Sequence, residues 1–258
     1  MLQSTLATQE LIMVKIDTLV SKMKAVGFMY AQADIERILS LASDNDLSHI
    51  ELLANALDDE ISQRNAARIE KNKKQSNINN PKTIEEFDFK AQTSITKREI
   101  NDLVNFQFID NRENIVFIGN SSLGKTHLAT GIALKALDKG YKVYFSNALE
   151  LLESLYLAEL KGRLKNKINQ LLKFDLIVID ELGYLPMNKG SMYNLFQLIH
   201  AMYEYRSLII TSNKEFTDWN EFFCNDTVAV PVIERIIHHS KIFMLRGESY
   251  RLRGKTRN

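Results

Sequence analysis

The segment Gly119–Thr126 has the residue types and the spacing of a loop that binds phosphate groups. It reads GNSSLGKT and fits the pattern G-x-x-x-x-G-K-[ST]. Its glycines let backbone N–H groups point at phosphate oxygens, Lys125 can reach the β- and γ-phosphates, and the Thr126 hydroxyl can bind Mg²⁺. We therefore predict that ATP is bound by these residues and the next one: Gly119, Asn120, Ser121, Ser122, Leu123, Gly124, Lys125, Thr126 and His127.

An acidic pair at the end of an apolar segment is the second motif. Asp180 and Glu181 follow the apolar run Leu176–Ile179, which has the composition of a buried strand. Asp180 is suited to hold Mg²⁺ through water, and Glu181 to orient or deprotonate an attacking water molecule. Alone, the pair could be a solvated acidic turn. Together with the phosphate-binding loop, it predicts ATP hydrolysis.

Two further side chains have the chemistry to assist hydrolysis. Asn213 ends the segment SLIITSN and can hydrogen-bond the γ-phosphate or the attacking water, although asparagine after a strand also commonly forms turns. Arg235 lies within the apolar stretch VIERII, where an arginine needs an anionic partner. That partner could be a local acid such as Glu234, or a phosphate bound to a neighbouring subunit.

The elements around these motifs alternate between strands and helices. We expect strands at Ile115–Ile118, Val143–Phe145, Leu176–Ile179, Leu208–Thr211 and Ile242–Leu245, and helices at Leu128–Leu137 and Met192–Tyr205, with Gly140 closing the first helix. Such alternation predicts an α/β fold, in which helices flank a parallel five-stranded sheet and ligands bind at the carboxyl ends of the strands.

Residues 1–75 have a different character. They contain no proline, and apolar residues recur at helical spacing, while Ser48 and Glu51 form a capping box. We predict a small all-α domain over residues 1–75, which contacts DNA or a partner protein. Residues 76–81 have the composition of a linker, and an ATPase domain follows over residues 82–258.

Overall charge does not favour any class of partner. The chain has 33 Lys and Arg against 32 Asp and Glu, so any DNA contact must come from a local basic surface. The candidates are Lys161–Lys167 and Arg64–Lys74, each of which could equally be a solvated helix face. The single Cys224, the lack of a signal peptide and the short apolar runs indicate a cytoplasmic protein without a membrane segment.

Other conspicuous residues have simpler explanations. His238 and His239 lack partners at metal-ligand spacing. Four phenylalanines could pack near an adenine ring, but a position in the core is favoured for them: Phe87, Phe89, Phe106 and Phe108.

Several motifs together resemble one family. These are GKTH at the phosphate-binding loop, DELGY at the acidic pair, TSN at Asn213, ERIIHH around Arg235 and GESYRLR near the end of the chain. The combination is similar to the IstB-like helper ATPases of bacterial insertion sequences, which are kin of the DnaC-type helicase loaders within the AAA+ group of P-loop ATPases. The resemblance covers residues 80–258 and, more loosely, the N-terminal helices.

The resemblance implies an AAA+ (ASCE-type) core without a separate C-terminal lid. It also implies self-assembly on double-stranded DNA and delivery of that DNA to a partner transposase. By position, Lys125 and Thr126 resemble the Walker A pair, Asp180 and Glu181 the Walker B pair, and Asn213 the first sensor. Arg235 resembles an arginine finger that acts in a homo-oligomer, and Arg251 a second sensor.

Three alternatives remain open at this stage. A helicase loader would have the same chemistry and a replicative helicase as its partner. A nucleotide-gated scaffold would bind ATP without hydrolysing it, which the intact Glu181 argues against. A P-loop kinase would need an acceptor-binding pocket, for which the sequence offers no candidate.

Overall fold

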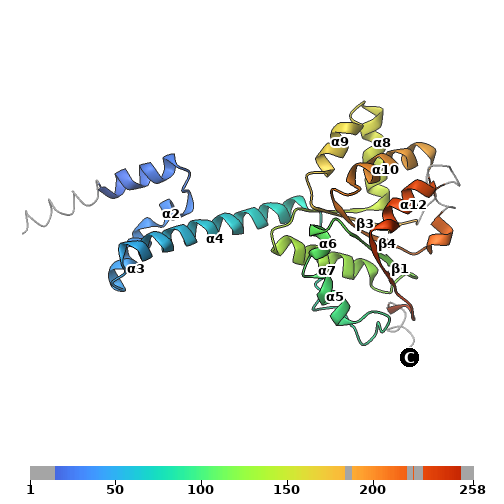
Figure 1. Cartoon of the computed structure of the whole chain (residues 1–258), viewed down its shortest axis with the longest axis horizontal. Coiled ribbons are helices and arrows are strands. Elements are labelled where there is room, and N and C mark those ends of the chain that lie inside the picture. The colour runs from blue at the N-terminus through green and yellow to red at the C-terminus, as the bar shows by residue number, and fades with distance from the viewer. Residues whose placement is uncertain (1–14, 184–187, 220–222, 224–228, 251–258) are drawn as a thin grey trace, which may run out of the picture. The chain divides into compact units, whose positions relative to one another are not determined.

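The computed structural model in Figure 1 describes residues 15–183, 188–219, 223 and 229–250. The chain divides into two compact units, Met1–Glu70 and Lys71–Asn258, which are described separately. Within the described residues, no helix combines the length and the apolar character that crossing a membrane requires.

The described part of the first unit is helical, as the sequence predicts. Residues 15–25 form a helix, followed by α2 (Tyr30–Ala33), α3 (Ile35–Asp44) and α4 (His49–Gln75), the last of which continues into the second unit. The capping box starts α4, because the Ser48 backbone N–H donates to Glu51 Oε2 at 2.8 Å and the Glu51 N–H donates to Ser48 Oγ at 3.3 Å.

A buried carboxylate holds this unit together. Glu60 on α4 is only 3% exposed, and it accepts hydrogen bonds from the backbone N–H groups of Met29, Tyr30 and Ala31 at 2.7–3.1 Å. Arg64 Nε donates to the same carboxylate at 2.6 Å. Burial raises the pKa of Glu60, but these hydrogen bonds outweigh it and lower the pKa to about 2. The carboxylate therefore stays ionised and ties the start of α2 to α4.

The second unit is built on a five-stranded sheet in the order β2-β3-β4-β1-β5, with every pair of neighbours parallel. The strands are β1 (Asn114–Ile118), β2 (Val143–Asn147), β3 (Leu176–Leu182), β4 (Ser207–Ser212) and β5 (Ser240–Met244). The predicted α/β class and parallel sheet are confirmed. All the carboxyl ends of the strands therefore meet at one edge, where ligands of such sheets bind.

Helices cover both faces of the sheet (Figure 1). Their bounds are α5 (Lys97–Leu103), α6 (Gln107–Asp110), α7 (Lys125–Asp138), α8 (Ala148–Leu160), α9 (Leu164–Leu171), α10 (Lys189–Met202) and α12 (Ala229–His238), with a 3₁₀ turn at Phe216–Asp218. The helix expected to reach Tyr205 ends at Met202, because Tyr203 takes an extended ψ of 129° that cannot continue a helix.

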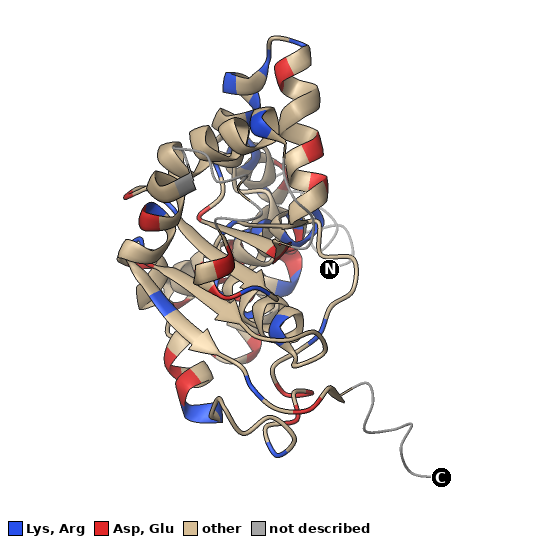
Figure 2. Cartoon of the chain, turned by 90° about the vertical axis from the view of Figure 1, so that its right-hand side faces the viewer, with Lys and Arg blue, Asp and Glu red and all other residues tan. Residues whose placement is uncertain are grey.

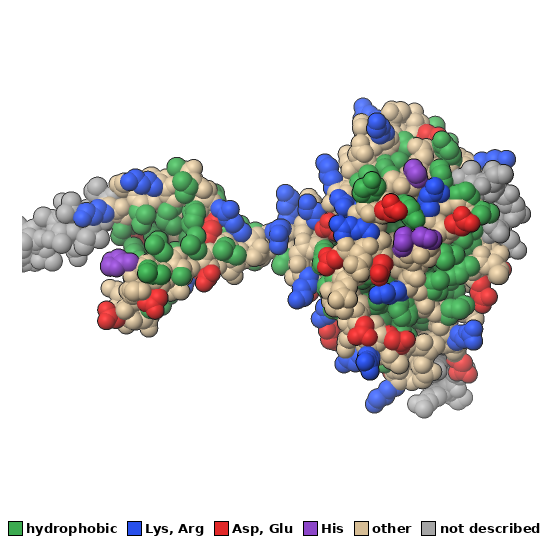
Figure 3. All heavy atoms as spheres, viewed as in Figure 1, with side chains coloured by type: hydrophobic (Ala, Val, Ile, Leu, Met, Phe, Trp, Pro, Cys, Tyr) green, Lys and Arg blue, Asp and Glu red, His purple; other side chains and the backbone are tan. Residues whose placement is uncertain are grey.

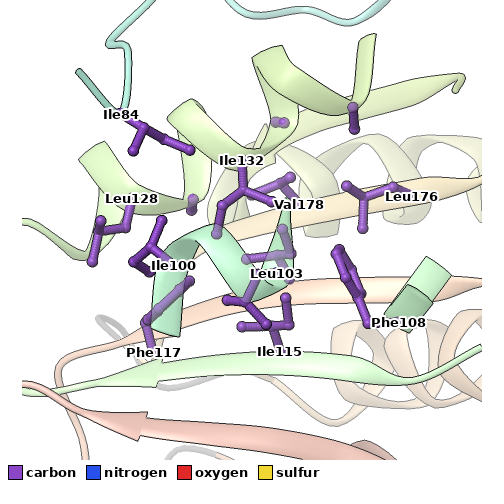
Figure 4. Packing of buried hydrophobic residues seen from close by; sticks show 14 of the residues in the cluster. Ile84, Ile100, Leu103, Phe108, Ile115, Phe117, Leu128, Ile132, Leu176 and Val178 are labelled. Carbon is purple, nitrogen blue, oxygen red and sulfur yellow. The ribbon is translucent and has the colours of Figure 1, made fainter. Parts of the chain in front are cut away.

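Alternation along β3 separates the two halves of the core. Leu176 and Val178 pack with α5, α6 and α7, whereas Ile177 and Ile179 pack with α8, α9, α10 and α12. Successive side chains of a strand point to opposite faces, so the apolar run at the start of β3 contributes to both layers. Figure 4 shows the first layer, with Ile132 of α7 and Ile100 of α5 directed toward the strands. The sheet is thereby fixed firmly enough to hold side chains at its carboxyl edge.

Candidate nucleotide site

The loop between β1 and α7 has glycine where no other residue fits. Gly119 has φ +148°, and a Cβ there would lie 2.1 Å from the Leu245 carbonyl oxygen. Gly124 has φ +91°, and a Cβ there would lie 2.5 Å from the Phe87 ring. Both positions combine a left-handed backbone with no space for a side chain. The two glycines of the motif therefore serve the shape of the loop, which then leads directly into the N-terminus of α7.

Lys125 is folded back onto this loop. Its Nζ donates to the carbonyl oxygens of Gly119 at 2.6 Å and Asn120 at 2.7 Å. Burial lowers the pKa of Lys125, while the nearby charges of Asp180 and Glu181 act in the opposite direction. An ammonium group that is largely desolvated and bonded to neutral carbonyls is poised to bind an anion such as a phosphate group.

Asp180 lies between two threonine hydroxyls at the end of β3. Its Oδ1 accepts from Thr126 Oγ1 at 2.9 Å and from Thr211 Oγ1 at 2.6 Å. Burial raises the pKa of Asp180, and the negative charge of Glu181 raises it further. The two hydroxyl hydrogen bonds and the positive charge of Lys125 lower the pKa, but the net shift is upward. A buried carboxylate beside a threonine oxygen suits Mg²⁺, which binds through a few protein oxygens together with substrate phosphates.

The backbone at Glu181 is strained. Glu181 has φ +60°, and the register between β3 and β4 shifts between Ile179 and Leu182. A non-glycine residue in this region costs energy and is often found at functional sites. The expected strand end at Ile179 was therefore too early: β3 continues through the acidic pair to Leu182, with an irregularity that turns the Glu181 side chain outward.

Two residues that received no catalytic role from the sequence hold Glu181 in place. Asn147, the last residue of β2, donates from Nδ2 to Glu181 Oε2 at 2.9 Å. Thr211 of β4 accepts from the Glu181 backbone N–H at 2.9 Å. Asn147 also caps α8, because its side chain accepts from the Leu149 N–H. Asn147 and Thr211 lie at the carboxyl ends of the two strands that flank β3. This position at a strand end is the feature of the sequence that could have identified them as site residues.

Lys125, Thr126 and Glu181 line one cavity of about 650 Å³, a size suited to a nucleotide. Glu181, Thr211 and Asn213 line it together with residues 121–127 of the loop. The Asn213 Oδ1 atom is buried and has no hydrogen-bond partner in the described structure. The side-chain oxygen therefore does not form the turn that is common for an asparagine after a strand. An unpartnered amide oxygen at this position is free to accept from a bound water molecule.

The rest of the cavity is lined by the segment before α5 and by the end of the described chain. We call residues 82–94 the strap; its Phe87 lines the cavity while packing edge-on against His127, with ring centroids 5.3 Å apart. His127 Nε2 lies 2.7 Å from the Thr83 carbonyl oxygen, which anchors the strap to α7. Phe106 and Phe108 are buried core residues, as expected, whereas Phe87 belongs to the core and to the cavity wall.

Arg235 lies outside the nucleotide cavity, close to two aromatic rings. It does not line this cavity, and within the described residues it forms no ion pair with Glu234 or any other acid. Its Cζ lies 5.4 Å from the ring centroid of Phe196 and 6.0 Å from that of Tyr203, and its Nη1 donates to the Pro231 carbonyl. Arg251 lies outside the described residues. No group of three potential metal ligands occurs among described His, Cys, Asp and Glu side chains, the histidine pair included.

The parallel sheet, the phosphate-binding loop and the acidic pair define an ATPase of the AAA+ type. Among solved structures, the DnaC helicase loader matches with a TM-score of 0.52 and 19% identity over 67% of this chain and 96% of that one. DnaA from Aquifex aeolicus bound to AMPPCP also matches with a TM-score of 0.52, at 20% identity over 68% of this chain and 54% of that one. At these identities the similarity establishes the fold.

The chain belongs to the IstB-like ATP binding protein family, whose model matches residues 19–258. It is 42% identical to the ATP-binding protein of insertion sequence IS5376 from Geobacillus stearothermophilus, over 83% of this chain and 85% of the relative. It is 35% identical to the ATP-binding protein of insertion sequence IS21 from Pseudomonas aeruginosa, over 93% of this chain and 90% of the relative. The protein is therefore a transposition-associated ATPase, and the family resemblance noted in the sequence is confirmed.

Proposed function

We propose that this protein assembles on double-stranded DNA in its ATP-bound form and delivers that DNA to a partner transposase, with ATP hydrolysis ending the cycle. The insertion-sequence relatives support the transposition role. The observation that carries the ATP-dependent step is that Lys125, Thr126 and Glu181 line one cavity of nucleotide size, while Asp180 is hydrogen-bonded to Thr126.

The proposed chemistry assigns one task to each side chain. Lys125 would exchange its carbonyl partners for the β- and γ-phosphates, and Thr126 and Asp180 would hold Mg²⁺. When bound, the metal ion neutralises charge that develops on the phosphates. Glu181 takes a proton from the attacking water, and Asn213 orients that water.

Replacing Lys125 with alanine tests the nucleotide site. Loss of two charge-assisted hydrogen bonds to phosphate, each worth about 1.5–3 kcal/mol, should weaken ATP binding by about 100-fold or more. Calorimetric titration with Mg-ATP measures the effect, and Lys139→Ala on an exposed position after α7 is the matched control. An unchanged affinity in Lys125→Ala would remove the basis of the phosphate-loop assignment.

A transposase partner is distinguished from a helicase partner by direct competition. The purified chain, loaded with ATP on DNA, is offered in parallel a transposase of a related insertion sequence and a replicative helicase. We expect the transposase alone to be retained and to be stimulated in strand transfer. Retention and loading of the helicase instead would assign the chain to the helicase-loader role.

The surface offers one basic segment better suited to DNA than the other. On the sides drawn in Figures 2 and 3, both basic and acidic residues are present. Within α4, Arg64 already pairs with Glu60 and Lys73 with Asp138. In the turn before α9 and in α9 itself, Lys161, Arg163 and Lys165 are exposed, and none forms an ion pair with another described residue. We therefore propose that residues Lys161–Lys167 contact the DNA phosphates.

DNA binding should fall steeply with salt and be indifferent to sequence. Each phosphate that a basic side chain neutralises releases counterions, so replacing Lys161, Arg163 and Lys165 with glutamine should lower the slope of log K against log salt by about one for each phosphate that is no longer bound. Fluorescence anisotropy on duplexes of different sequence measures the slope. The triple variant Lys97→Gln, Arg98→Gln, Lys139→Gln removes equally exposed charge elsewhere and should leave the slope unchanged. Equal slopes in both triple variants would contradict the assignment.

A further inference from the structure

The residues that line the nucleotide cavity fall into three groups. Glu181, Thr211 and Asn213 come from the carboxyl ends of β3 and β4 or directly after them, where the γ-phosphate and the attacking water must lie if the acidic pair is catalytic. Residues 121–127 belong to the loop suited to bind the phosphate chain. The lining residues outside these two groups are the candidates for contact with the ribose and the base.

Two segments far apart in sequence form that remaining wall. One is the strap, which contributes Lys82, Glu86, Phe87, Asp88, Ala91 and Gln92. The other is the segment that follows β5, residues 245–250, which we call the tail; it contributes Glu248 and Tyr250. The tail runs beside the phosphate-binding loop, since the Tyr250 backbone contacts Ser122.

Hydrogen bonds tie the strap, the loop and the tail into one frame. Gln92 Nε2 donates to the Leu123 carbonyl at 3.3 Å, and Gln92 Oε1 accepts from Ser94 Oγ. The same Ser94 Oγ accepts from the backbone N–H of Arg246 at 2.9 Å. The Tyr250 N–H donates to the Ser122 carbonyl at 3.1 Å, so the tail is fixed to the loop at its far end as well. The Tyr250 backbone is therefore held at a defined place in the cavity wall.

The two six-membered aromatic rings on this wall differ in their surroundings. Phe87 is 9% exposed, and its ring packs against Gly124, Phe89 and His127. Tyr250 is 59% exposed and makes no ring contact with another described residue. Tyr250 is therefore an exposed aromatic ring in the wall of the nucleotide cavity, fixed by its own backbone, and its flat apolar face is available for stacking.

We propose that the Tyr250 side chain stacks on the base of the bound nucleotide. Stacking buries one face of the base against the ring and is worth about fivefold to 100-fold in affinity. The inference rests on the proposed ATP site, because the base can reach Tyr250 only if the phosphates are bound by the adjoining loop. It makes Tyr250 a binding residue for the nucleoside, separate from the residues that bind the phosphates.

The test compares ligands that have a base with one that has none. The full chain and its variants are titrated with Mg-ATP, Mg-ADP and Mg-tripolyphosphate. Tyr250→Ala should weaken ATP and ADP binding by about fivefold or more, and leave tripolyphosphate binding within about twofold of the wild type. Retained tripolyphosphate binding also shows that the variant is folded. Tyr250→Phe keeps the ring and should bind all three ligands as the wild type does.

Tyr205→Ala is the matched control, because Tyr205 is 67% exposed and does not line the cavity. The proposal is overturned if Tyr250→Ala binds ATP like the wild type, if it loses tripolyphosphate equally, or if Tyr250→Phe behaves like Tyr250→Ala. Failure of the ATP site itself gives a different result. In that case Lys125→Ala would keep its affinity for all three ligands, including tripolyphosphate.

Discussion

Arg235→Ala is expected to bind ATP normally and to lose about 10³- to 10⁵-fold in hydrolysis rate, the range found for arginine fingers. The residue lies outside the cavity of its own subunit, so nucleotide affinity should not change. We propose that its guanidinium reaches the γ-phosphate bound by a neighbouring subunit, where negative charge grows in the transition state. Phosphate release and equilibrium titration measure the two quantities.

Folding should survive this substitution. The described partners of Arg235 are the rings of Phe196 and Tyr203 and one backbone carbonyl, and a cation–π contact is worth about 0.5–1 kcal/mol at such a site. Arg235→Lys keeps the positive charge but loses the planar guanidinium group, so its hydrolysis rate should lie between those of Arg235→Ala and the wild type. A variant that loses activity because its structure is disturbed would instead show a lowered melting temperature.

Mixing subunits decides whether Arg235 acts between chains. Arg235→Ala has an intact pocket and no finger, whereas Lys125→Ala has a finger and no pocket. Mixed assemblies should recover part of the activity that each variant lacks alone. If mixed assemblies form and remain inactive, Arg235 acts within its own chain, through its packing on Phe196 and Tyr203.

Glu181→Gln should keep ATP binding and slow hydrolysis by about 10²- to 10⁴-fold, the usual contribution of a positioned general base. The glutamine carbonyl can still accept from Asn147 Nδ2, and the hydrogen bonds of Asp180 with Thr126 and Thr211 are unaffected. The substitution therefore removes the proton acceptor and leaves its surroundings in place.

The consequence of Glu181→Gln should be an assembly that persists on DNA, because bound ATP is no longer consumed. Sedimentation of DNA complexes after dilution of free ATP measures that persistence. Glu150→Gln on α8 changes an exposed carboxylate outside the cavity and should turn over like the wild type. Hydrolysis at the wild-type rate in Glu181→Gln would exclude this residue as the base.

The amino-acid sequence determined the phosphate-binding loop, the acidic pair and the α/β class. Each of these depends on neighbouring residues: glycines within one turn, carboxylates directly after an apolar strand, and strands alternating with helices. The length of β3 was underestimated because a strained residue with φ +60° continues the strand past the point where apolar residues stop. A one-dimensional pattern contains no signal for such a backbone conformation.

Tertiary structure alone decided which distant residues support the chemistry. Asn147 contacts Glu181 only because β2 pairs with β3, and Thr211 contacts Asp180 only because β4 lies on the other side of β3. The strap and the tail meet at Ser94 and Arg246, which are 152 positions apart. Hydrogen bonds act over about 3 Å whatever the sequence separation of their partners, so strand order, and not spacing along the chain, selected these residues.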